Sequence, residues 1–405
     1  MVKESLLWII LVLVRVLYYC NLQIGIIAVD TPSYADYDIS LGARTPGYPL
    51  IIDLCQMVLG EKYNYGVFLI QCIVSFISLI YLYRCIIMIL YSKDWKDIEE
   101  DGPRKDLARV LCLLYGVNPV LVRWDVYILT ESLAVSFTIF FIYQCLKIVL
   151  AGGVKWGILA AITVVVCPSI KTALFIYAFD LFVLLLLMTV FEKERRKELC
   201  ICLGACAGSF VFLAIWIFII HYYTGLWSFA TYIVKHQLVK ALQTGLYKNY
   251  PDKGIVEAIN LIISETDLPV YDWKILTPVY DLIGGGYPEK LRFANDCLNT
   301  DRKGFFLFQL RTILEAATTS YVGGTYIVAI LSLACLIYKW IREKKCPYIL
   351  LGISGGMISI YVSVFWGSYG PWGRLLIYIV PFVFCGIAAI IAELYNLRAS
   401  HRIHY

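Results

Sequence analysis

The chain has 405 residues, of which 60% are hydrophobic and only 16% charged, and its formal net charge is +5. A soluble domain with this apolar fraction would expose large apolar patches and aggregate, so the composition excludes an ordinary soluble protein and predicts an all-α polytopic membrane protein. The basic residues gather in a few loops, which is typical of a topology signal and argues against nucleic acid as a partner.

The first apolar segment is predicted at residues 5–29 and is interrupted only by Arg15. No small-residue cleavage site follows it, so we interpret it as a retained membrane helix and not as a cleaved signal. The loop that follows, residues 30–64, is acidic and rich in turn residues, and an interfacial helix is expected to begin near Pro46.

Further apolar segments bring the expected number of membrane helices to about ten, each near the ~20 residues that a bilayer core requires. They are predicted at residues 65–91, 107–122, 128–150, 156–167, 173–191, 199–221, 325–340, 348–366 and 375–395. The fifth segment is short, which predicts a tilted or broken helix. The two halves of the chain show no internal repeat, and this counts against the inverted-repeat transporter folds.

Clusters of Lys and Arg follow every second apolar segment, at residues 93–105, 155, 193–197, 339–345 and 398–402. Positive residues favour cytoplasmic loops, so both termini are expected in the cytoplasm. The loops after the odd-numbered segments then lie outside the cytoplasm, and the lipid bilayer is the first expected partner.

Three regions follow from this topology: an N-terminal transmembrane module with the first outer loop, a long extracytoplasmic loop, and C-terminal transmembrane helices, at residues 1–220 (loop 30–64), 221–324 and 325–405. A structureless loop of ~100 residues is unusual in a compact protein. Short helices packed on the outer surface of the bundle are therefore expected in it, and apolar-periodic pieces occur at residues 255–263 and 305–317.

Carboxylates and cations gather in the predicted outer loops, at Asp30, Asp36, Asp38, Arg44, Asp125, Glu131, Lys171 and Arg374. Ionisable groups at membrane depth are costly, so they usually pair or serve a function. A carboxylate can take a proton from an acceptor, while Lys and Arg neutralise a leaving phosphate. The mixture predicts one site where these loops converge, suited to a donor whose leaving group is a lipid phosphate.

Each of these residues also has an ordinary structural explanation. Asp30 can cap a helix, Arg44 can reach lipid headgroups, and Glu131 can meet the dipole at the start of its helix. Lys171 and Arg374 can be interfacial anchors. The four histidines are far apart in sequence, so a metal site built from them is not expected.

Four stretches carry a family resemblance: D-T-P-S-Y-A-D from Asp30 to Asp36, R-T-P-G-Y-P from Arg44 to Pro49, Y-I-L-T-E-S-L from Tyr127 to Leu133, and G-R-L-L-I-Y-I-V-P-F from Gly373 to Phe382. S-I-K-T at residues 169–172 adds a weaker match. In their order and spacing these motifs resemble the GT-C superfamily of integral-membrane glycosyltransferases, in the branch of protein O-mannosyltransferases and bacterial aminoarabinose transferases.

The resemblance implies that Asp30 is the catalytic base, although some family members have an acidic pair where this chain has Asp30 and Thr31. It implies no cofactor and no strict metal requirement. The residues expected to bind substrate are Asp36, Asp38, Arg44, Tyr48, Asp125, Glu131, Lys171, Arg374 and Tyr378.

The first functional hypothesis is an inverting glycosyltransferase in a bacterial plasma membrane. It would move a sugar from a polyprenyl-phosphate donor to a glycan or lipid acceptor of the cell envelope. The alternatives are a polysaccharide polymerase or ligase that uses a polyprenyl-diphosphate donor, and a transporter or flippase without enzymatic activity. The sequence names neither the sugar nor the acceptor.

Overall fold

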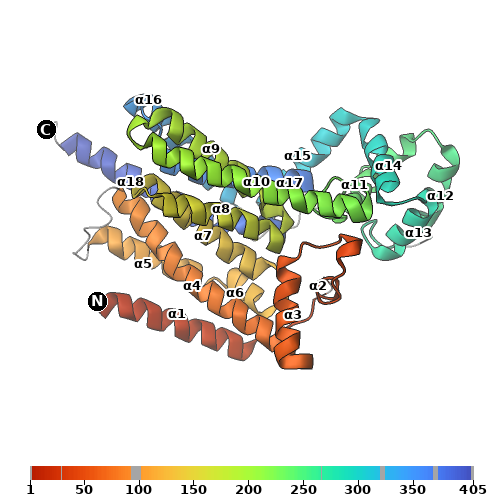
Figure 1. The fold of residues 1–405 in the computed structure, drawn as a ribbon, viewed down its shortest axis with the longest axis horizontal. Helices are drawn as coiled ribbons and strands as arrows, with labels where there is room; N and C mark the ends of the chain where they lie inside the picture. Colours follow the sequence, from red (N-terminus) through yellow and green to blue (C-terminus); the bar gives the residue numbers. More distant parts are fainter. Residues whose placement is uncertain are drawn as a thin grey trace.

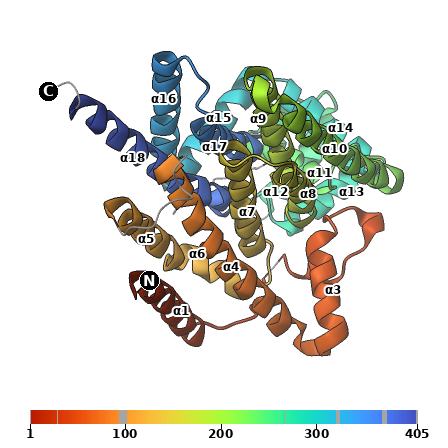
Figure 2. The ribbon, with the colours of Figure 1, turned by 60° about the vertical axis from the view of Figure 1, so that its left-hand side comes forward.

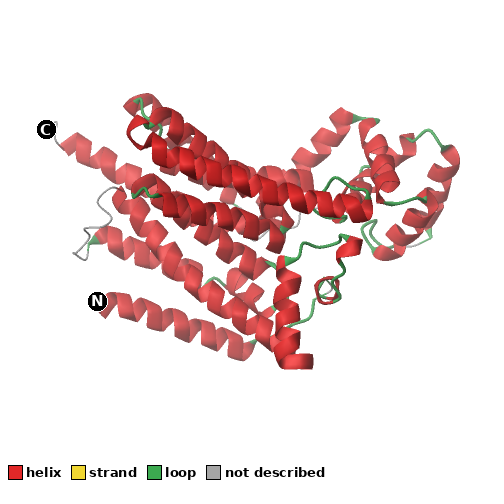
Figure 3. Ribbon diagram, viewed as in Figure 1, coloured by secondary structure: helices red, strands yellow, loops and turns green. Residues whose placement is uncertain are grey.

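The computed structural model describes residues 2–28, 30–92, 102–265, 267–319, 324–367 and 373–402, without the side chains of residues 2, 316–319, 364–367, 373–375 and 398–402. Within these ranges the regular structure is helical (Figure 3), and one isolated parallel bridge joins Ile26 to Tyr127.

Each apolar segment predicted from the sequence coincides with one or two helices (Figure 1): α1 (Val2–Asn21), α4 (Tyr63–Tyr91), α5 (Pro103–Gly116) with α6 (Pro119–Val126), α7 (Glu131–Leu150), α8 (Val154–Ile170), α9 (Ile176–Phe191), α10 (Arg196–Thr224), α16 (Thr325–Glu343), α17 (Tyr348–Gly367) and α18 (Val380–Arg402). Among the described residues, 7 helices are long and apolar enough to cross a membrane, or up to 8 if the bent pair counts as one span. The helices α8 and α17 are shorter but also apolar. The chain is therefore an all-α polytopic membrane protein.

Helix α7 lies at the centre of the bundle, between α4 and α8 (Figure 2). In its most apolar stretch 72% of the residues are buried, against 17% in α1 and in α16. The outer helices therefore direct large apolar side chains away from the protein, as a lipid-facing helix does. The central position of α7 also fixes Glu131, its first residue, inside the bundle.

The first helix is shorter than its apolar segment predicted, because α1 ends at Asn21 and not at residue 29. The Asn21 side-chain amide donates to the Leu17 carbonyl at 2.7 Å at the end of the helix, and the φ of +66° at Gly25 is incompatible with a helix that resumes there. The chain beyond is extended: the Ile26 amide donates to the Val126 carbonyl at 2.8 Å. Residues 22–28 thus join the turn between α6 and α7.

The third predicted segment is two helices and not one, because α5 and α6 meet at an angle of 48°. Pro119 at the start of α6 has no N–H to continue the helical hydrogen bonds. The Asn118 side chain accepts from the Val120 amide at 2.9 Å and so begins the second helix. The bend turns the Asp125 carboxylate toward α1, where it accepts from Arg15.

The first loop forms α2 (Pro32–Ala35), the 3-10 turn η1 (Ile39–Leu41) and α3 (Gly47–Leu59). Helix α3 begins next to Pro46, as predicted. Its outer face is apolar and exposed, at Leu50, Leu54, Met57 and Val58. A helix with such a face is suited to lie in the membrane interface.

The segment between α10 and α16 forms α11 (Tyr232–Gln243), α12 (Lys253–Ser264), α13 (Trp273–Ile283), α14 (Tyr287–Asn299) and α15 (Arg302–Thr319). The two apolar-periodic pieces lie in α12 and α15. Residues of α11 to α14 share a hydrophobic core of their own, separate from that of the bundle. We call residues 232–299 the helical insert. It projects beyond one end of the bundle (Figure 1, right), opposite the end where α1 begins and α18 finishes.

Candidate functional site

Asp30 and Arg44 form an ion pair in the first loop. The Arg44 Nη2 atom donates to Asp30 Oδ1 at 3.2 Å, and the exposed fractions of the two side chains are 15% for Arg44 and 28% for Asp30. The Asp30 carboxylate is therefore held by a fixed cation, yet it remains open to solvent on one side. This is the accessibility that a base or a substrate-binding carboxylate requires.

The Arg44 guanidinium lies between two aromatic rings. Its central carbon is 4.3 Å from the centroid of Tyr34 and 4.2 Å from that of Tyr232, and Nη2 also donates to the Tyr232 hydroxyl at 3.1 Å. Burial by itself lowers the pKa of Arg44, but the neighbouring phenol groups and the Asp30 and Glu131 carboxylates outweigh it and raise the pKa. The cation is thus locked in place by stacking and by charge.

A second ion pair joins Glu131 to Lys171. The Lys171 ammonium donates to Glu131 Oε1 at 3.2 Å, and the carboxylate is only 1% exposed. Glu131 opens α7, and Lys171 follows the last residue of α8, so each charge complements a helix dipole. The Tyr378 ring, in the 3-10 turn η7 (Gly373–Ile379), lies 6.0 Å from the ammonium. These three predicted site residues are brought together.

The backbone around Asp30 is tied to the turn between α6 and α7. The Thr31 hydroxyl donates to the Ile128 carbonyl at 2.9 Å and accepts from the Ala28 amide at 2.8 Å. The Ser33 hydroxyl donates to the Asp30 carbonyl at 2.6 Å and accepts from Arg44 Nε at 2.9 Å. The position of Asp30 is therefore set by the turn between α6 and α7 and by Arg44.

The R-T-P-G-Y-P motif packs the first loop against the end of α8. A Cβ atom at Gly47 would lie 2.8 Å from the backbone oxygen of Ser169, two residues before Lys171, so glycine is required for this close approach. The neighbouring Tyr48 is fully buried, its hydroxyl donates to Gln71 Oε1 at 2.7 Å, and its ring packs edge-on against Tyr34 at 5.2 Å. Tyr48 thus supports the ring on which Arg44 lies.

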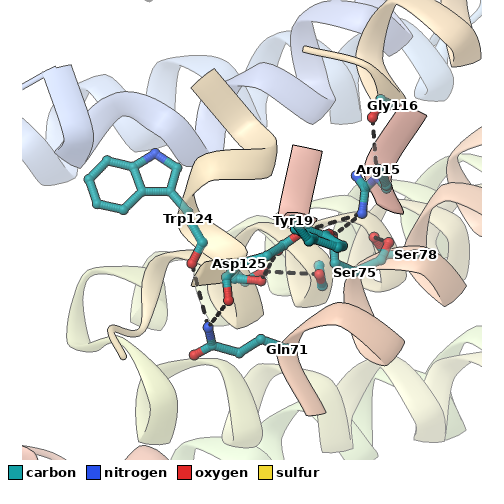
Figure 4. Close-up of polar contacts among 10 residues, drawn as sticks. Arg15, Tyr19, Gln71, Ser75, Ser78, Gly116, Trp124 and Asp125 are labelled. Atoms are coloured by element: carbon teal, nitrogen blue, oxygen red, sulfur yellow. Dashed lines mark hydrogen bonds and ion pairs between the residues drawn. The ribbon is translucent and has the colours of Figure 1, made fainter. Parts of the chain in front are cut away.

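Asp125 lies in a different buried network, shown in Figure 4. Its Oδ2 atom accepts from Arg15 at 3.3 Å and from the Tyr19 hydroxyl at 2.7 Å, while Oδ1 accepts from Ser132. Both carboxylate oxygens are therefore directed to protein donors on α1 and α7. The structure does not bring the Asp125 side chain to the two ion pairs.

The remaining predicted residues are more peripheral. Asp36 is exposed at the end of α2, and Asp38 is exposed as the cap of η1. The amide and the hydroxyl of Ser40 both donate to Asp38, at 2.8 and 2.7 Å, and these hydrogen bonds lower its pKa. The side chain of Arg374 lies outside the described residues.

Sequence reasoning missed the contribution of the helical insert. Tyr232 touches Arg44, and the Lys235 ammonium lies 6.0 Å from the Tyr232 ring and 4.2 Å from the Trp273 ring. Burial lowers the pKa of Lys235, whereas the charges of Asp30 and Asp272 raise it. Because Asp30 belongs to the first loop, Lys235 lies near that loop. The available signal was the spacing of Tyr232 and Lys235, which puts both side chains on one helical face.

No set of His, Cys, Asp or Glu side chains in the described ranges is arranged to hold a metal ion. No protein-family model matches the chain, and no curated protein matches it. Among solved structures, the chain is similar to the crystal structure of the Archaeoglobus fulgidus oligosaccharyltransferase in complex with Zn and sulfate, with a TM-score of 0.44 and 13% sequence identity. The likeness covers 88% of this chain but only 41% of that one.

Proposed function

We propose that the chain is an inverting glycosyltransferase of the GT-C type. It takes a sugar from a polyprenyl-phosphate donor and transfers it to a glycan or lipid acceptor of the cell envelope, on the extracytoplasmic side of the membrane. The motifs from Asp30 to Pro49, around Glu131 and around Tyr378 support the class, since they lie close together at one end of the bundle.

One observation carries the proposal. The partly exposed Asp30 carboxylate is fixed beside the Arg44 guanidinium, and the Glu131–Lys171 ion pair belongs to the same site. Glu131 is near enough to Arg44 to influence its pKa, so the two ion pairs form one electrostatic cluster. The cluster lies at the end of the bundle that carries the insert and α3 (Figure 1). A lipid-anchored donor reaches such a position from the bilayer.

The chemistry assigns a separate task to each pair. Asp30 accepts the proton of the acceptor hydroxyl while that oxygen forms a bond to the anomeric carbon of the sugar. The bond between the anomeric carbon and the phosphate oxygen breaks, and polyprenyl phosphate leaves with the electron pair. Lys171, held by Glu131, neutralises the charge that develops on the leaving phosphate. Attack opposite to the leaving group inverts the configuration.

The test is sugar transfer by purified protein in lipid nanodiscs, with labelled sugars on a polyprenyl monophosphate. The variant Asp30→Asn should lower the transfer rate by about 10²–10⁴-fold, the range expected for loss of a general base. Glu61→Gln is the matched control, because Glu61 is an exposed carboxylate of the same loop, residues 30–64, and has no proposed role in the site. It should transfer at the wild-type rate.

Undiminished transfer by a normally folded Asp30→Asn protein would rule out Asp30 as the base. Transfer only from a diphosphate-linked donor would identify a polymerase or ligase instead. Movement of an intact lipid-linked sugar across the bilayer, without transfer, would identify a flippase.

A further inference from the structure

Cations and aromatic rings alternate across the face of the helical insert, beginning at Arg44. The Tyr232 ring touches Arg44, and Lys235 lies over both Tyr232 and Trp273. The Trp273 and Tyr280 rings are 6.4 Å apart, and the Lys290 ammonium lies 5.2 Å from the Tyr280 ring. We call Tyr232, Lys235, Trp273, Tyr280 and Lys290 the cation–aromatic ladder.

The ladder is assembled from three helices. Tyr232 and Lys235 are one turn apart on α11, Trp273 and Tyr280 are two turns apart on α13, and Lys290 belongs to α14. The core of the insert is filled by other side chains of these helices, including Ile275, Leu276 and Val279. Packing against this core accounts for part of the Tyr280 ring, but not for the other four residues of the ladder.

The ladder is open to a ligand. Trp273 is 49% exposed, so part of its ring remains uncovered after Lys235 has packed on it. Over the described part of the chain, neither Lys235 nor Lys290 forms an ion pair with a carboxylate, although Asp30 and Asp272 are near enough to Lys235 to raise its pKa. Lys235 beside the exposed Trp273 ring, and Lys290 beside the half-buried Tyr280 ring, are thus available to an anion with apolar faces.

Sugars have the matching chemistry. The C–H groups on one face of a pyranose ring carry partial positive charge and pack on the negative face of an aromatic ring. A carboxylate or phosphate on the sugar forms charge-assisted hydrogen bonds with ammonium groups. Tyr232 is part of the ladder and also accepts a hydrogen bond from Arg44, which pairs with Asp30. A glycan that lies along the ladder therefore ends next to the Asp30 carboxylate.

We infer that the ladder is an acceptor subsite for an anionic carbohydrate, with sugar rings on Trp273 and Tyr280 and acidic groups at Lys235 and Lys290. The inference rests on the proposed glycosyltransferase function and names the chemical class of its acceptor. It also gives the insert a role, namely to present the glycan end to Asp30.

The experiment measures binding and not transfer. Full-length protein in phosphatidylcholine nanodiscs is titrated with oligogalacturonate and with a neutral maltooligosaccharide of the same length. Wild-type protein should bind the anionic oligomer at least about tenfold more tightly. The variants Trp273→Ala and Lys235→Gln should each weaken that binding by about tenfold, whereas Trp273→Phe, which keeps a ring, should retain most of it.

Lys274→Gln is the matched control, because Lys274 is an exposed lysine of α13 next to Trp273. It should bind like the wild type. Equal binding of the neutral and anionic oligomers, or unchanged binding by Trp273→Ala, overturns the inference. Direct binding of inorganic phosphate that is lost in Lys235→Gln, with no oligogalacturonate binding, would assign the ladder to the donor phosphate and overturns the inference as well. Binding only to anionic phosphatidylglycerol vesicles would assign it to a lipid surface, with the same consequence.

The two proposals fail separately. Asp30→Asn should bind oligogalacturonate at least as tightly as the wild type, because it keeps every ladder side chain and removes a negative charge next to the glycan end. If Asp30→Asn also transfers sugar normally, the assignment of the base is wrong while the binding result stands. If transfer depends on Asp30 but no ladder variant changes binding, only the acceptor subsite is wrong.

Discussion

Arg44 and Tyr232 are 188 residues apart in sequence, yet the guanidinium donates to the tyrosine hydroxyl at 3.1 Å and lies 4.2 Å from the centre of its ring. The contact joins the first loop to the helical insert. The Thr231 amide strengthens the same junction, since it donates to the Gly42 carbonyl at 2.8 Å. The orientation of Asp30, which pairs with Arg44, therefore depends on the insert as well as on its own loop.

This geometry predicts that Arg44→Lys is not a conservative change. Lysine keeps the positive charge but loses the planar group that stacks between two rings and donates to Asp30, Ser33 and Tyr232 at once. We expect the rate of sugar transfer to fall by about tenfold or more, since each lost hydrogen bond of a charged group is worth about 1.5–3 kcal/mol. The measurement is transfer by the purified variant in nanodiscs.

Arg123→Lys provides the control for this substitution. Arg123 is exposed and lies 5.4 Å over the Trp124 ring, outside the Asp30 cluster. The control should transfer at the wild-type rate. A wild-type rate for Arg44→Lys would mean that the stacked geometry does not matter for the reaction.

Sequence reasoning reached the membrane helices and placed Asp30 and Arg44 in one loop, but it did not predict their ion pair. Hydropathy identifies the spans because a helix in lipid must be apolar over its length. Asp30 and Arg44 are 14 residues apart in that loop, and their contact also depends on Tyr232, which holds the Arg44 guanidinium. Tyr232, Lys235 and Trp273 belong to a distant polar segment, and no local pattern states which loop they contact.

A second prediction concerns Gly47, where a Cβ atom would lie 2.8 Å from the Ser169 backbone oxygen. Gly47→Ala must push α3 away from the end of α8, and with it the loop that carries Arg44. We expect transfer to fall by about tenfold and the thermal midpoint in detergent to drop, because backbone cannot yield as a flexible side chain does.

Gly204→Ala is the matched control, because Gly204 is a helical glycine of α10 with open space around its Cβ position. Alanine favours a helix by about 1 kcal/mol over glycine, so this control should be neutral or slightly stabilising. A Gly47→Ala protein with wild-type activity and midpoint would contradict the close approach of α3 and α8.

A third prediction tests the buried pair of Arg15 and Asp125, whose side chains are 5% and 3% exposed. Arg15→Met leaves the Asp125 carboxylate buried without its cation and should cost about 3–5 kcal/mol of stability. The double variant Arg15→Met with Asp125→Asn should recover most of this loss, because the asparagine oxygen still accepts from Tyr19. Denaturant unfolding in detergent measures both, and equal stability of the single variant and the wild type would refute the argument.

The same pair shows why a charge pattern alone does not define a site. From the sequence, Asp125 stood with the other outer carboxylates, and Arg15 was only an interruption in an apolar segment. The bend between α5 and α6 determines which residues Asp125 contacts, because it turns the Asp125 carboxylate toward α1. Such a bend follows from Pro119, but its direction depends on packing with the whole bundle.

A fourth prediction concerns Lys240, which is fully buried in the core of the insert, 5.9 Å from the Phe305 ring. Burial lowers its pKa to about 7, against about 10.4 for lysine in an unfolded chain. Between these values the unfolded state binds more protons than the folded state, so stability must rise with pH, by at most about 1.4 kcal/mol per pH unit. Below pH 7 both states bind the proton, and the penalty stays constant.

Lys240→Met keeps the length of the side chain and removes the charge. The variant should therefore be more stable than the wild type at pH 7, and the rise in stability between pH 7 and pH 9 should be smaller by the Lys240 contribution. Lys248→Met, at an exposed lysine of the same insert, should keep the wild-type pH dependence. The measurement is the thermal midpoint of each protein in detergent at both pH values. If the stability of Lys240→Met rises between pH 7 and pH 9 as much as that of the wild type, the uptake of a proton by Lys240 on unfolding does not limit the stability of the insert.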